Sequence, residues 1–376
     1  MPKDLIDTSR WEPTRVPVGT DVADAASVEL PLQRLTNRDR FLLDQMHRMQ
    51  LLNLREDVDF SGVSTAGVSN VHSACYDEST GLITVVMDET ATPYSMESAD
   101  GGMTWTDGAD RWTGGGRQPQ DVASNGQGTR IAIHSSVDRK ITHHDGSAWQ
   151  PSTMVDASSG RLLSCDGARN SRSNAQFMAA GDSGKVYRSE DGQTFVDCSP
   201  AGLSEETIHV IAHTKSQAGA DQWVAVTNTY AACSSDGGDT WRVGEHGLTL
   251  AQFQDTDSLY WDDSRSRWLL LLEGAAVAVS EDAKTWKEGT LLPRALRASR
   301  QKIVGDGQGN LLVAASTLET GALFGSCDGG QRWFEIVVKE ANSIPATTLF
   351  ALAYGRGRFS VLWSNSGLSG LYSMAL

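Results

Sequence analysis

Short segments in which β-branched and aromatic residues alternate with polar ones recur along most of the chain, and clusters of Gly, Asn and Asp separate them. Residues 208–244 show the pattern clearly, because IHVIAHT, WVAVTNT, AACSS and DTWRVG follow one another with turn sequences between them. The same order of four segments recurs at residues 71–107 and 257–289. Such alternation is typical of strands that bury one face, so the sequence predicts an all-β fold.

A short signature marks the turn between the third and fourth strands of each unit, as SADGGMTW, HHDGSAW, SEDGQTF, SSDGGDTW, SEDAKTW and SCDGGQRW. Neighbouring signature aspartates are 45 or 46 residues apart, a regularity that unrelated turns do not produce. Four strands in about 45 residues is the period of one blade of a β-propeller. The signature aspartates are Asp100, Asp145, Asp191, Asp236, Asp282 and Asp328.

After the sixth unit the chain contains only three strand-like segments, LFALAYG, RFSVLWSN and LYSMAL, so the last unit lacks a fourth strand. An unpaired outer edge would expose backbone donors and acceptors. The segment Val58–Ser64 has the length and composition of a strand. We therefore predict a seven-bladed propeller of four-stranded antiparallel blades over residues 57–376, in which Val58–Ser64 forms the outer strand of the last blade and closes the ring.

The signature has a structural explanation: the aspartate accepts backbone N–H bonds across its own turn, the glycine supplies a positive φ, and the tryptophan packs beneath the hairpin. The repeats resemble the Asp-box, or bacterial neuraminidase repeat, of sialidases, sortilin-like receptors, photosystem assembly factors and phage and bacterial propellers. The resemblance extends over residues 68–376 and implies that the six aspartates are turn residues. The second copy has His143 and His144 before its aspartate and lacks the serine, and the fifth copy has Ala283 in place of the glycine. We therefore expect these two turns to be looser.

Residues 1–56 contain no repeat and are predicted to form a separate attachment segment. The early sequence WEPTRVPVGTDVADAAS predicts an extended arm that needs a partner to be ordered. Thr36 and Asp39 have the spacing of a capping box, so an amphipathic helix is expected to follow, either packed on the propeller flank or associated in a short trimeric bundle. Its apolar face, the candidate surface for partner attachment, contains Leu35, Leu42, Met46 and Met49.

The string LPLQRLTNRDRFL resembles short segments near the beginning of many tail-fibre and baseplate proteins of tailed phages, just after an attachment region. The resemblance implies that the segment attaches the chain to other tail or baseplate proteins. We therefore expect a virion protein that is synthesised in the host cytoplasm. The start MPKDLIDTSRW agrees, because it has acidic residues where a secretory signal needs basic and then apolar ones. The matching positions are Leu32, Leu35, Asn37, Arg38 and Leu42 or Leu43.

The composition and motifs of the chain argue against several classes of binding partner and cofactor. The formal net charge of −15 repels phosphate backbones and anionic lipid, so we expect no nucleic acid as a partner. The sequence has no run of about 18 apolar residues, so membrane insertion is not expected. The five cysteines form no CxxC pair, and His209 and His213 lack a carboxylate at matching spacing, so we predict no metal site. No P-loop or dinucleotide fingerprint occurs, and no cofactor is expected.

The resemblance to Asp-box propellers implies that a ligand, if one is bound, occupies the face opposite the Asp-boxes. Loops between second and third strands and connections between blades form this face. An aromatic side chain beside an arginine can stack on a sugar ring and bind its hydroxyl or carboxylate groups. Each such residue can also simply cover a seam between blades. The candidates for ligand or partner binding are Trp112, Arg117, Asp138, Asp182, Tyr230, Arg294, Arg297 and Glu319.

The leading functional hypothesis is a non-enzymatic structural protein of a phage or phage-tail-like particle, a tail-fibre or baseplate component. Its propeller would recognise a host receptor, a cell-surface glycan or a partner, and the chain could form a homotrimer. One alternative is an Asp-box glycoside hydrolase similar to sialidases, but the arginine, tyrosine and acid constellation of that family is not recognisable, so no catalytic residue is predicted. A second alternative is a cellular assembly factor similar to the photosystem type.

Overall fold

The computed structural model describes residues 54–373 apart from 64–67, 90–91, 109–117, 136–139, 156–159, 169–174, 215–221, 249–253, 258, 273, 275, 296–298, 317–319, 337–349 and 365–367. The expected arm and helix, with Leu35, Leu42, Met46 and Met49, lie outside the described residues. Within the described ranges the chain forms strands and turns and contains no α-helix.

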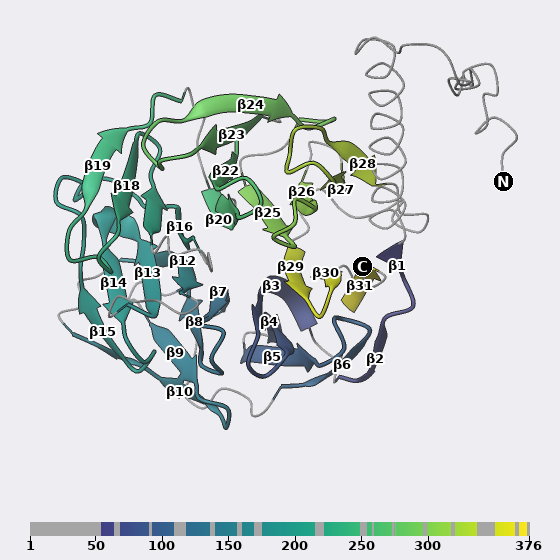
Figure 1. The fold of residues 1–376 in the computed structure, drawn as a ribbon. Coiled ribbons are helices and arrows are strands. Elements are labelled where there is room, and N and C mark those ends of the chain that lie inside the picture. The colour runs from purple at the N-terminus through teal and green to yellow at the C-terminus, as the bar shows by residue number, and fades with distance from the viewer. Residues whose placement is uncertain are drawn as a thin grey trace, which may run out of the picture. The chain divides into compact units, whose positions relative to one another are not determined.

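Seven β-sheets form a ring, with the first strand of each at the centre and the last at the outside (Figure 1). The predicted seven-bladed propeller is therefore confirmed. Blade 1 consists of β3 (Val68–Asp77), β4 (Leu82–Glu89), β5 (Thr92–Ser98) and β6 (Thr104–Asp107). Blade 2 consists of β7 (Pro119–Ser124), β8 (Arg130–His134), β9 (Ile141–His144) and β10 (Trp149–Pro151). Blade 3 consists of β12 (Leu162–Gly167), β13 (Phe177–Gly181), β14 (Val186–Ser189) and β15 (Thr194–Asp197).

The remaining blades have the same order of antiparallel strands. Blade 4 consists of β16 (Val210–His213), β17 (Trp223–Val226), β18 (Tyr230–Ser234) and β19 (Arg242–Glu245). Blade 5 consists of β21 (Leu259–Asp262), β22 (Arg267–Leu271), β23 (Ala276–Ser280) and β24 (Lys287–Leu291). Blade 6 consists of β25 (Ser299–Gly305), β26 (Leu311–Ser316), β27 (Gly321–Ser326) and β28 (Phe334–Ile336). Blade 7 consists of β29 (Phe350–Gly355), β30 (Arg358–Ser364), β31 (Leu368–Ser373) and β1 (Leu54–Arg55).

The ring is closed by strands from both ends of the domain, as predicted, but the closing strand is β1. Leu54 pairs with Ser373 and Arg55 with Tyr372 in antiparallel register. The prediction that Val58–Ser64 closes blade 7 was wrong. That segment contains β2 (Asp59–Gly62), which has already crossed to blade 1 and pairs in parallel with β6.

Two further short strands extend the sheets. β11 (Thr153–Met154) pairs in parallel with β15, so the chain leaving blade 2 covers the outer edge of blade 3 just as β2 covers that of blade 1. β20 (Gln254–Asp257) instead pairs in parallel with the inner strand β25, between Ser299 and Lys302. It also contacts β12 and β16 and therefore lies inside the ring (Figure 1).

The hydrophobic core is divided into seven clusters, one in each seam between adjacent blades. The seam between blades 4 and 5 is typical, with Trp268 and Trp286 among aliphatic side chains of both blades. Among the described residues, the seam between blades 1 and 2 contains the smallest buried cluster, formed by Val86, Val122, Ala132 and Trp149. Apolar burial scales with area, so this seam gains the least from the hydrophobic effect.

The Asp-box turns have the expected geometry. Asp100 Oδ1 accepts the backbone N–H groups of Met103 and Thr104 at 2.9 and 3.0 Å, and the Trp105 indole donates to the Gly102 carbonyl at 3.0 Å. In the second copy, His144 Nδ1 takes the place of the serine oxygen and accepts the Gly146 N–H at 3.0 Å.

The turn at Asp282 is not looser, contrary to expectation. Its carboxylate accepts the N–H groups of Lys284 and Thr285 at 2.9 and 2.7 Å. Ala283 occupies the glycine position with a φ of 62°, a left-handed conformation that costs a non-glycine residue about 1 kcal/mol or more. Because the methyl group of Ala283 is fully buried against the seam between blades 4 and 5, packing offsets this cost.

Adding a methyl group at Gly167 is expected to open the seam between blades 2 and 3. A Cβ atom there would overlap the backbone carbonyl of Ser124 on blade 2, and a backbone atom cannot move aside as a side chain can. We expect Gly167→Ala to lower the free energy of unfolding by about 2 kcal/mol or more in urea titrations. The matched control is Gly244→Ala, where a Cβ meets nothing within 4 Å, and a similar loss in both variants would contradict this assignment.

The position of β1 predicts where the domain can be shortened. A chain beginning at Arg48 keeps β1 and should melt at the same temperature as the full chain. A chain beginning at Asp57 loses the pairing of Leu54 and Arg55 with β31, and should melt about 5 °C or more lower. Differential scanning calorimetry of both chains decides the point, and equal melting temperatures would show that β1 does not close the ring.

Candidate functional site

The seven inner strands enclose a cavity of about 480 Å³ on the axis of the ring. Every blade contributes to its wall, through β3, β7, β12, β16, β21, β25 and β29. The structure thus brings together residues that are almost 300 positions apart in the chain, which no local sequence pattern could indicate.

The cavity opens at the end of the channel that carries the Asp-boxes. Its rim includes Glu78, Asp263, Asp306 and Arg356, which belong to turns between first and second strands. Antiparallel strands alternate in direction, so these turns lie at the same end as those between third and fourth strands. At the level of Ser299–Lys302, towards the opposite end, β20 lies inside the channel.

The wall differs between the two halves of the ring. Blades 1, 5 and 7 contribute the aromatic side chains of Tyr76, Tyr260, Trp261 and Tyr354, whereas blades 2 to 4 contribute mainly small, polar and β-branched residues. Burial, with the nearby charges of Asp306 and Tyr76, raises the pKa of Tyr354. The ionisable carboxyl, ammonium and guanidinium groups of the wall are Glu78, Asp121, Asp166, Asp263, Lys302, Asp306 and Arg356.

Two of the aromatic rings lie against glycines of the adjacent blade. A Cβ at Gly355 would meet the ring of Tyr76, and one at Gly305 would meet the ring of Tyr260. Glycine is required at both positions because only a residue without a side chain lets a ring pack flat on the neighbouring inner strand. The rings therefore both seal the seam and form the cavity wall.

Two carboxylates of the wall, the buried Asp121 and the half-buried Asp166, bind backbone groups of the next blade. Asp121 Oδ2 accepts the N–H of Cys165 at 2.9 Å, and Asp166 Oδ2 accepts the N–H of His213 at 2.9 Å. Asp121 Oδ1 also accepts the hydroxyl of Ser73 on blade 1 at 2.7 Å. Burial raises the pKa of Asp121, and the ammonium group of Lys302 acts in the opposite direction. Both carboxylates thus connect inner strands.

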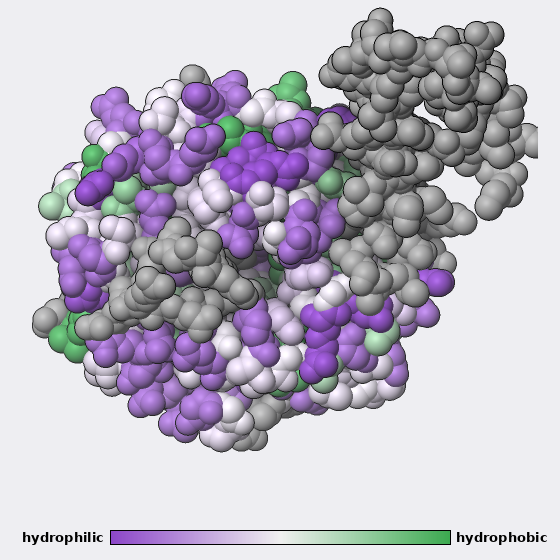
Figure 2. All heavy atoms as spheres, viewed as in Figure 1, coloured by the Kyte–Doolittle hydropathy of each residue, from purple (hydrophilic) through white to green (hydrophobic). Residues whose placement is uncertain are grey.

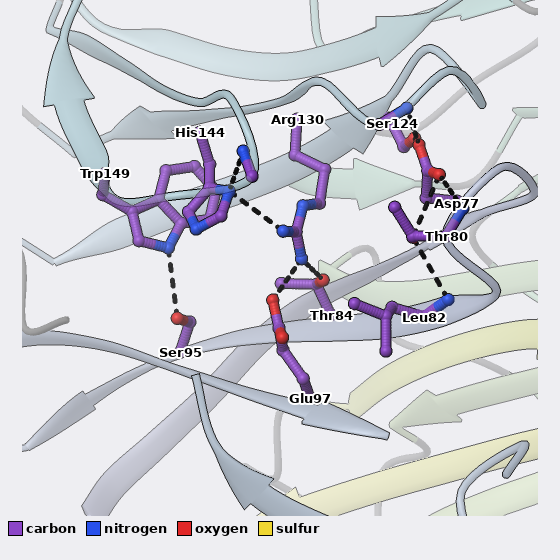
Figure 3. A network of polar contacts seen from close by, with 12 residues as sticks. Asp77, Thr80, Leu82, Thr84, Ser95, Glu97, Ser124, Arg130, His144 and Trp149 are labelled. Carbon is purple, nitrogen blue, oxygen red and sulfur yellow. Dashed lines mark hydrogen bonds and ion pairs between the residues drawn. The ribbon is translucent and has the colours of Figure 1, made fainter. Parts of the chain in front are cut away.

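A second buried network lies between blades 1 and 2, where the apolar cluster is smallest (Figure 3). The guanidinium group of Arg130 donates to Thr84 and Glu97 of blade 1, and its Nη2 lies 2.9 Å from His144 Nδ1. Burial and the charge of Arg130 lower the pKa of His144. The Trp149 indole donates to Ser95 at 3.1 Å, so polar contacts hold this seam where hydrophobic area is small.

Asp77 makes the other half of this network (Figure 3). Its Oδ2 accepts from the Ser124 hydroxyl at 2.6 Å and the Gly128 N–H at 2.8 Å, both on blade 2. Its Oδ1 accepts the Thr80 N–H of its own turn at 2.9 Å. Burial acts to raise the pKa of Asp77, but these hydrogen bonds outweigh it and lower the pKa to about 2.

Three of the eight predicted ligand-binding residues belong to the described part of the chain, and these three lie apart from this cavity. Asp182 accepts from the Arg161 N–H at 2.9 Å in blade 3, Tyr230 begins β18, and Arg294 forms an ion pair with Glu335 at 3.0 Å. None of these three lines the cavity, and they belong to different blades. The other five predicted residues, Trp112, Arg117, Asp138, Arg297 and Glu319, lie outside the described residues.

The Asp-box aspartates remain in their turns. Burial acts to raise the pKa of Asp100, Asp191, Asp236 and Asp328, but hydrogen bonds across each turn outweigh it and lower the pKa. Hydrogen bonds also lower the pKa of Asp145 and Asp282. Across the described ranges there is no group of three or more His, Cys, Asp or Glu side chains suited to a metal ion. The same residues include no helix long and apolar enough to span a membrane.

Sequence reasoning missed the cavity, although the segments that form it were visible. The ends of the first strands, such as YDE at 76–78, YWDD at 260–263 and YGR at 354–356, combine aromatic and charged residues. Each segment also fits an ordinary strand end followed by a turn. Only the ring shows that the seven strand ends surround one opening.

Comparisons with known proteins show the fold. No protein-family model matches the chain, and neither does any curated protein. The structure of YCF48 bound to D1 peptide has a TM-score of 0.58 at 15% identity, over 86% of this chain and 97% of that chain. YCF48 from Cyanidioschyzon merolae has a TM-score of 0.55 at 12% identity, over 86% and 98%. The GH74 xyloglucanase from Xanthomonas campestris has a TM-score of 0.57 at 15% identity, over 84% of this chain and 53% of that chain. At these identities the likeness is one of architecture.

Asp77 should make the stability of the propeller depend on pH. Its folded pKa of about 2 lies below its ordinary value of 3.8, so its contribution is present above about pH 4 and is lost as the pH falls towards 2. We expect Asp77→Asn to lower the free energy of unfolding at pH 7 by on the order of 1–3 kcal/mol. The difference from the unmodified chain should shrink in urea titrations below about pH 4. A difference that stays constant down to the lowest pH at which both are folded would contradict the ionised role of Asp77.

Proposed function

We propose that the chain is a non-enzymatic structural protein of a phage or phage-tail-like particle, a tail-fibre or baseplate component whose propeller recognises a host receptor or partner. The observation that carries the recognition role is the pocket on the channel axis. Residues from all seven blades form it, so its shape depends on the closed ring rather than on a single loop. Ligand sites in proteins commonly have volumes of about 300–1,000 Å³, a range that includes this cavity.

The non-enzymatic assignment is supported by the hydrogen bonds of two acids in the cavity wall, Asp121 and Asp166. A general acid or nucleophile needs a carboxyl group that can reach the substrate. Both Asp121 and Asp166 instead accept backbone N–H bonds from the next inner strand. Withdrawing either carboxylate for catalysis would leave a buried N–H without its acceptor, which costs about 1–3 kcal/mol.

Attachment is assigned to the N-terminal segment, residues 1–56. The tail-fibre resemblance of LPLQRLTNRDRFL and the apolar positions Leu35, Leu42, Met46 and Met49 support it. A trimeric arrangement of this segment would give three propellers on one stalk. On the propeller face shown in Figure 2, hydrophilic residues predominate, which suits a domain exposed to solvent in an assembled particle.

The second candidate is a cellular assembly factor that binds a protein segment. The structure of YCF48 with D1 peptide favours it, because that chain matches this one along almost its full length and holds a peptide. By contrast, this chain spans only about half of the GH74 xyloglucanase. Both candidates share a propeller that binds without catalysing a reaction, and they differ in where the protein resides.

Mass spectrometry of purified phage or tail-like particles from the source cells distinguishes the two candidates. The tail assignment predicts peptides from the propeller in the particles, at an abundance comparable to other tail proteins. A protein found only in the soluble fraction, bound to a cellular partner, would overturn this assignment and favour the assembly factor.

A panel of chromogenic glycosides provides the enzymatic control. The purified chain should hydrolyse none of them above the background of a heat-denatured sample. Turnover of any glycoside that is retained through purification would contradict the non-enzymatic assignment.

A further inference from the structure

The geometry points to an organic cation as the ligand of the axial cavity: an alkylammonium or guanidinium group, carried by a lysine or arginine side chain of a partner protein or by a free polyamine. This inference rests on the proposed recognition role and names the chemistry that the pocket would select. Three properties of the cavity lead to it: the charge of its wall, its aromatic residues and the exposed carboxylates at its rim.

The charge of the wall favours a cation. Five carboxyl groups and two cationic groups line the cavity, so its lining is acidic. The charge of Lys302 acts on Asp121 deep in the channel, and Arg356 Nε donates to the Gly81 carbonyl at 2.9 Å. Glu78 and Asp263 are exposed at the rim, where an approaching ligand meets them first. The net charge of −15 adds a long-range attraction for cations and repels carboxylated sugars.

The aromatic wall distinguishes an organic cation from an inorganic one. Tyr76, Tyr354 and Trp261 line one side of the pocket, and aromatic rings attract ammonium and guanidinium groups through their quadrupoles. The same rings cover the aliphatic stem of a lysine or arginine side chain. A bare metal ion would instead need several oxygen, nitrogen or sulfur ligands, and the described residues provide no such cluster.

The exposed rim suits a side chain or chain end that enters from outside. A ligand that passes Glu78 and Asp263 would bring its charged head to the carboxylates and aromatic residues of the wall. Partial exclusion of water in the pocket strengthens both the charge attraction and the cation–π contact relative to bulk solvent.

Isothermal titration calorimetry on the full chain at low salt tests this inference. The cationic probes are N-acetyl-arginine amide, N-acetyl-lysine amide and spermidine, with N-acetylglycine amide as the neutral control and N-acetylneuraminic acid as the anionic one. We expect saturable binding of the cations that weakens as salt is added, and none of the two controls. A preference for an amino-acid amide over spermidine indicates a partner's side chain, and the reverse indicates a free polyamine. No saturable binding of any cation, or tighter binding of the neuraminic acid, would overturn the inference.

Paired charge variants distinguish cation binding in the pocket from a general effect of the net charge on binding. The variant Glu78→Gln with Asp263→Asn removes two exposed rim carboxylates and should weaken cation binding by about tenfold or more. The matched control is Glu245→Gln with Glu288→Gln, which makes the same change of net charge on the exposed outer strands of blades 4 and 5. Equal weakening in both variants would refute a specific pocket. Circular dichroism melting curves confirm that both remain folded.

A second pair of variants tests the aromatic contribution. Tyr354→Phe keeps the ring and should retain binding, whereas Tyr354→Leu should weaken it severalfold, because only the ring provides the cation–π contact. Equal affinities of the two variants would contradict a role for this ring. The binding experiment and the particle experiment can fail separately. If the protein is absent from particles, a measured cation affinity still supports this inference. If the protein is present in particles but binds no cation, only this inference is refuted.

Discussion

The inner strand of a blade typically has one edge that pairs with no other strand of its sheet. The rest of the structure depends on how the backbone groups along these edges find hydrogen-bond partners. Six of the seven inner strands end their sheets, and only β25 has a further partner, β20. Backbone N–H groups on such an edge are buried when the ring closes, and each needs an acceptor. Side chains of the preceding blade provide them, as Asp121 does for Cys165 and Asp166 for His213.

The inner strands are held together in two ways, one in each part of the ring. The residue types of the cavity wall follow from the difference between these two kinds of contact. Around blades 1 to 4, carboxylates and hydroxyls connect inner strands, as Ser164 does in accepting the Ile211 N–H at 3.2 Å. In the seams between blades 5 and 6 and between blades 7 and 1, tyrosines contact glycines of the adjacent inner strand instead. The aromatic residues of the pocket wall consequently come from blades 1, 5 and 7. The asymmetry arises from packing between the inner strands.

The seam between blades 1 and 2 shows how polar contacts and apolar area balance. Its buried apolar cluster is the smallest of the seven, and the networks of Asp77 and Arg130 lie in the same place. Buried charges contribute only when their partners are in position, so this seam depends on geometry more than the others do. We expect acid to destabilise this seam before the other seams of the ring.

Much of the fold could be predicted from the sequence, because the spacing of the signature aspartates reports the length of each blade directly. The closing strand was misplaced since β1 has only two residues, too few for any periodicity, while Val58–Ser64 has a longer strand pattern that serves blade 1. The pocket could not be predicted, because its wall joins strand ends such as Tyr76 and Tyr354 that only ring closure brings together.

Amide hydrogen exchange at Cys165 and His213 tests the central claim most directly, that channel carboxylates hold adjacent inner strands together. In the intact protein both amides should exchange as slowly as those in the middle of a blade, and Asp121→Ala should accelerate Cys165 far more than His213. Exchange of both amides in the intact protein at the rate of exposed turns would contradict the account.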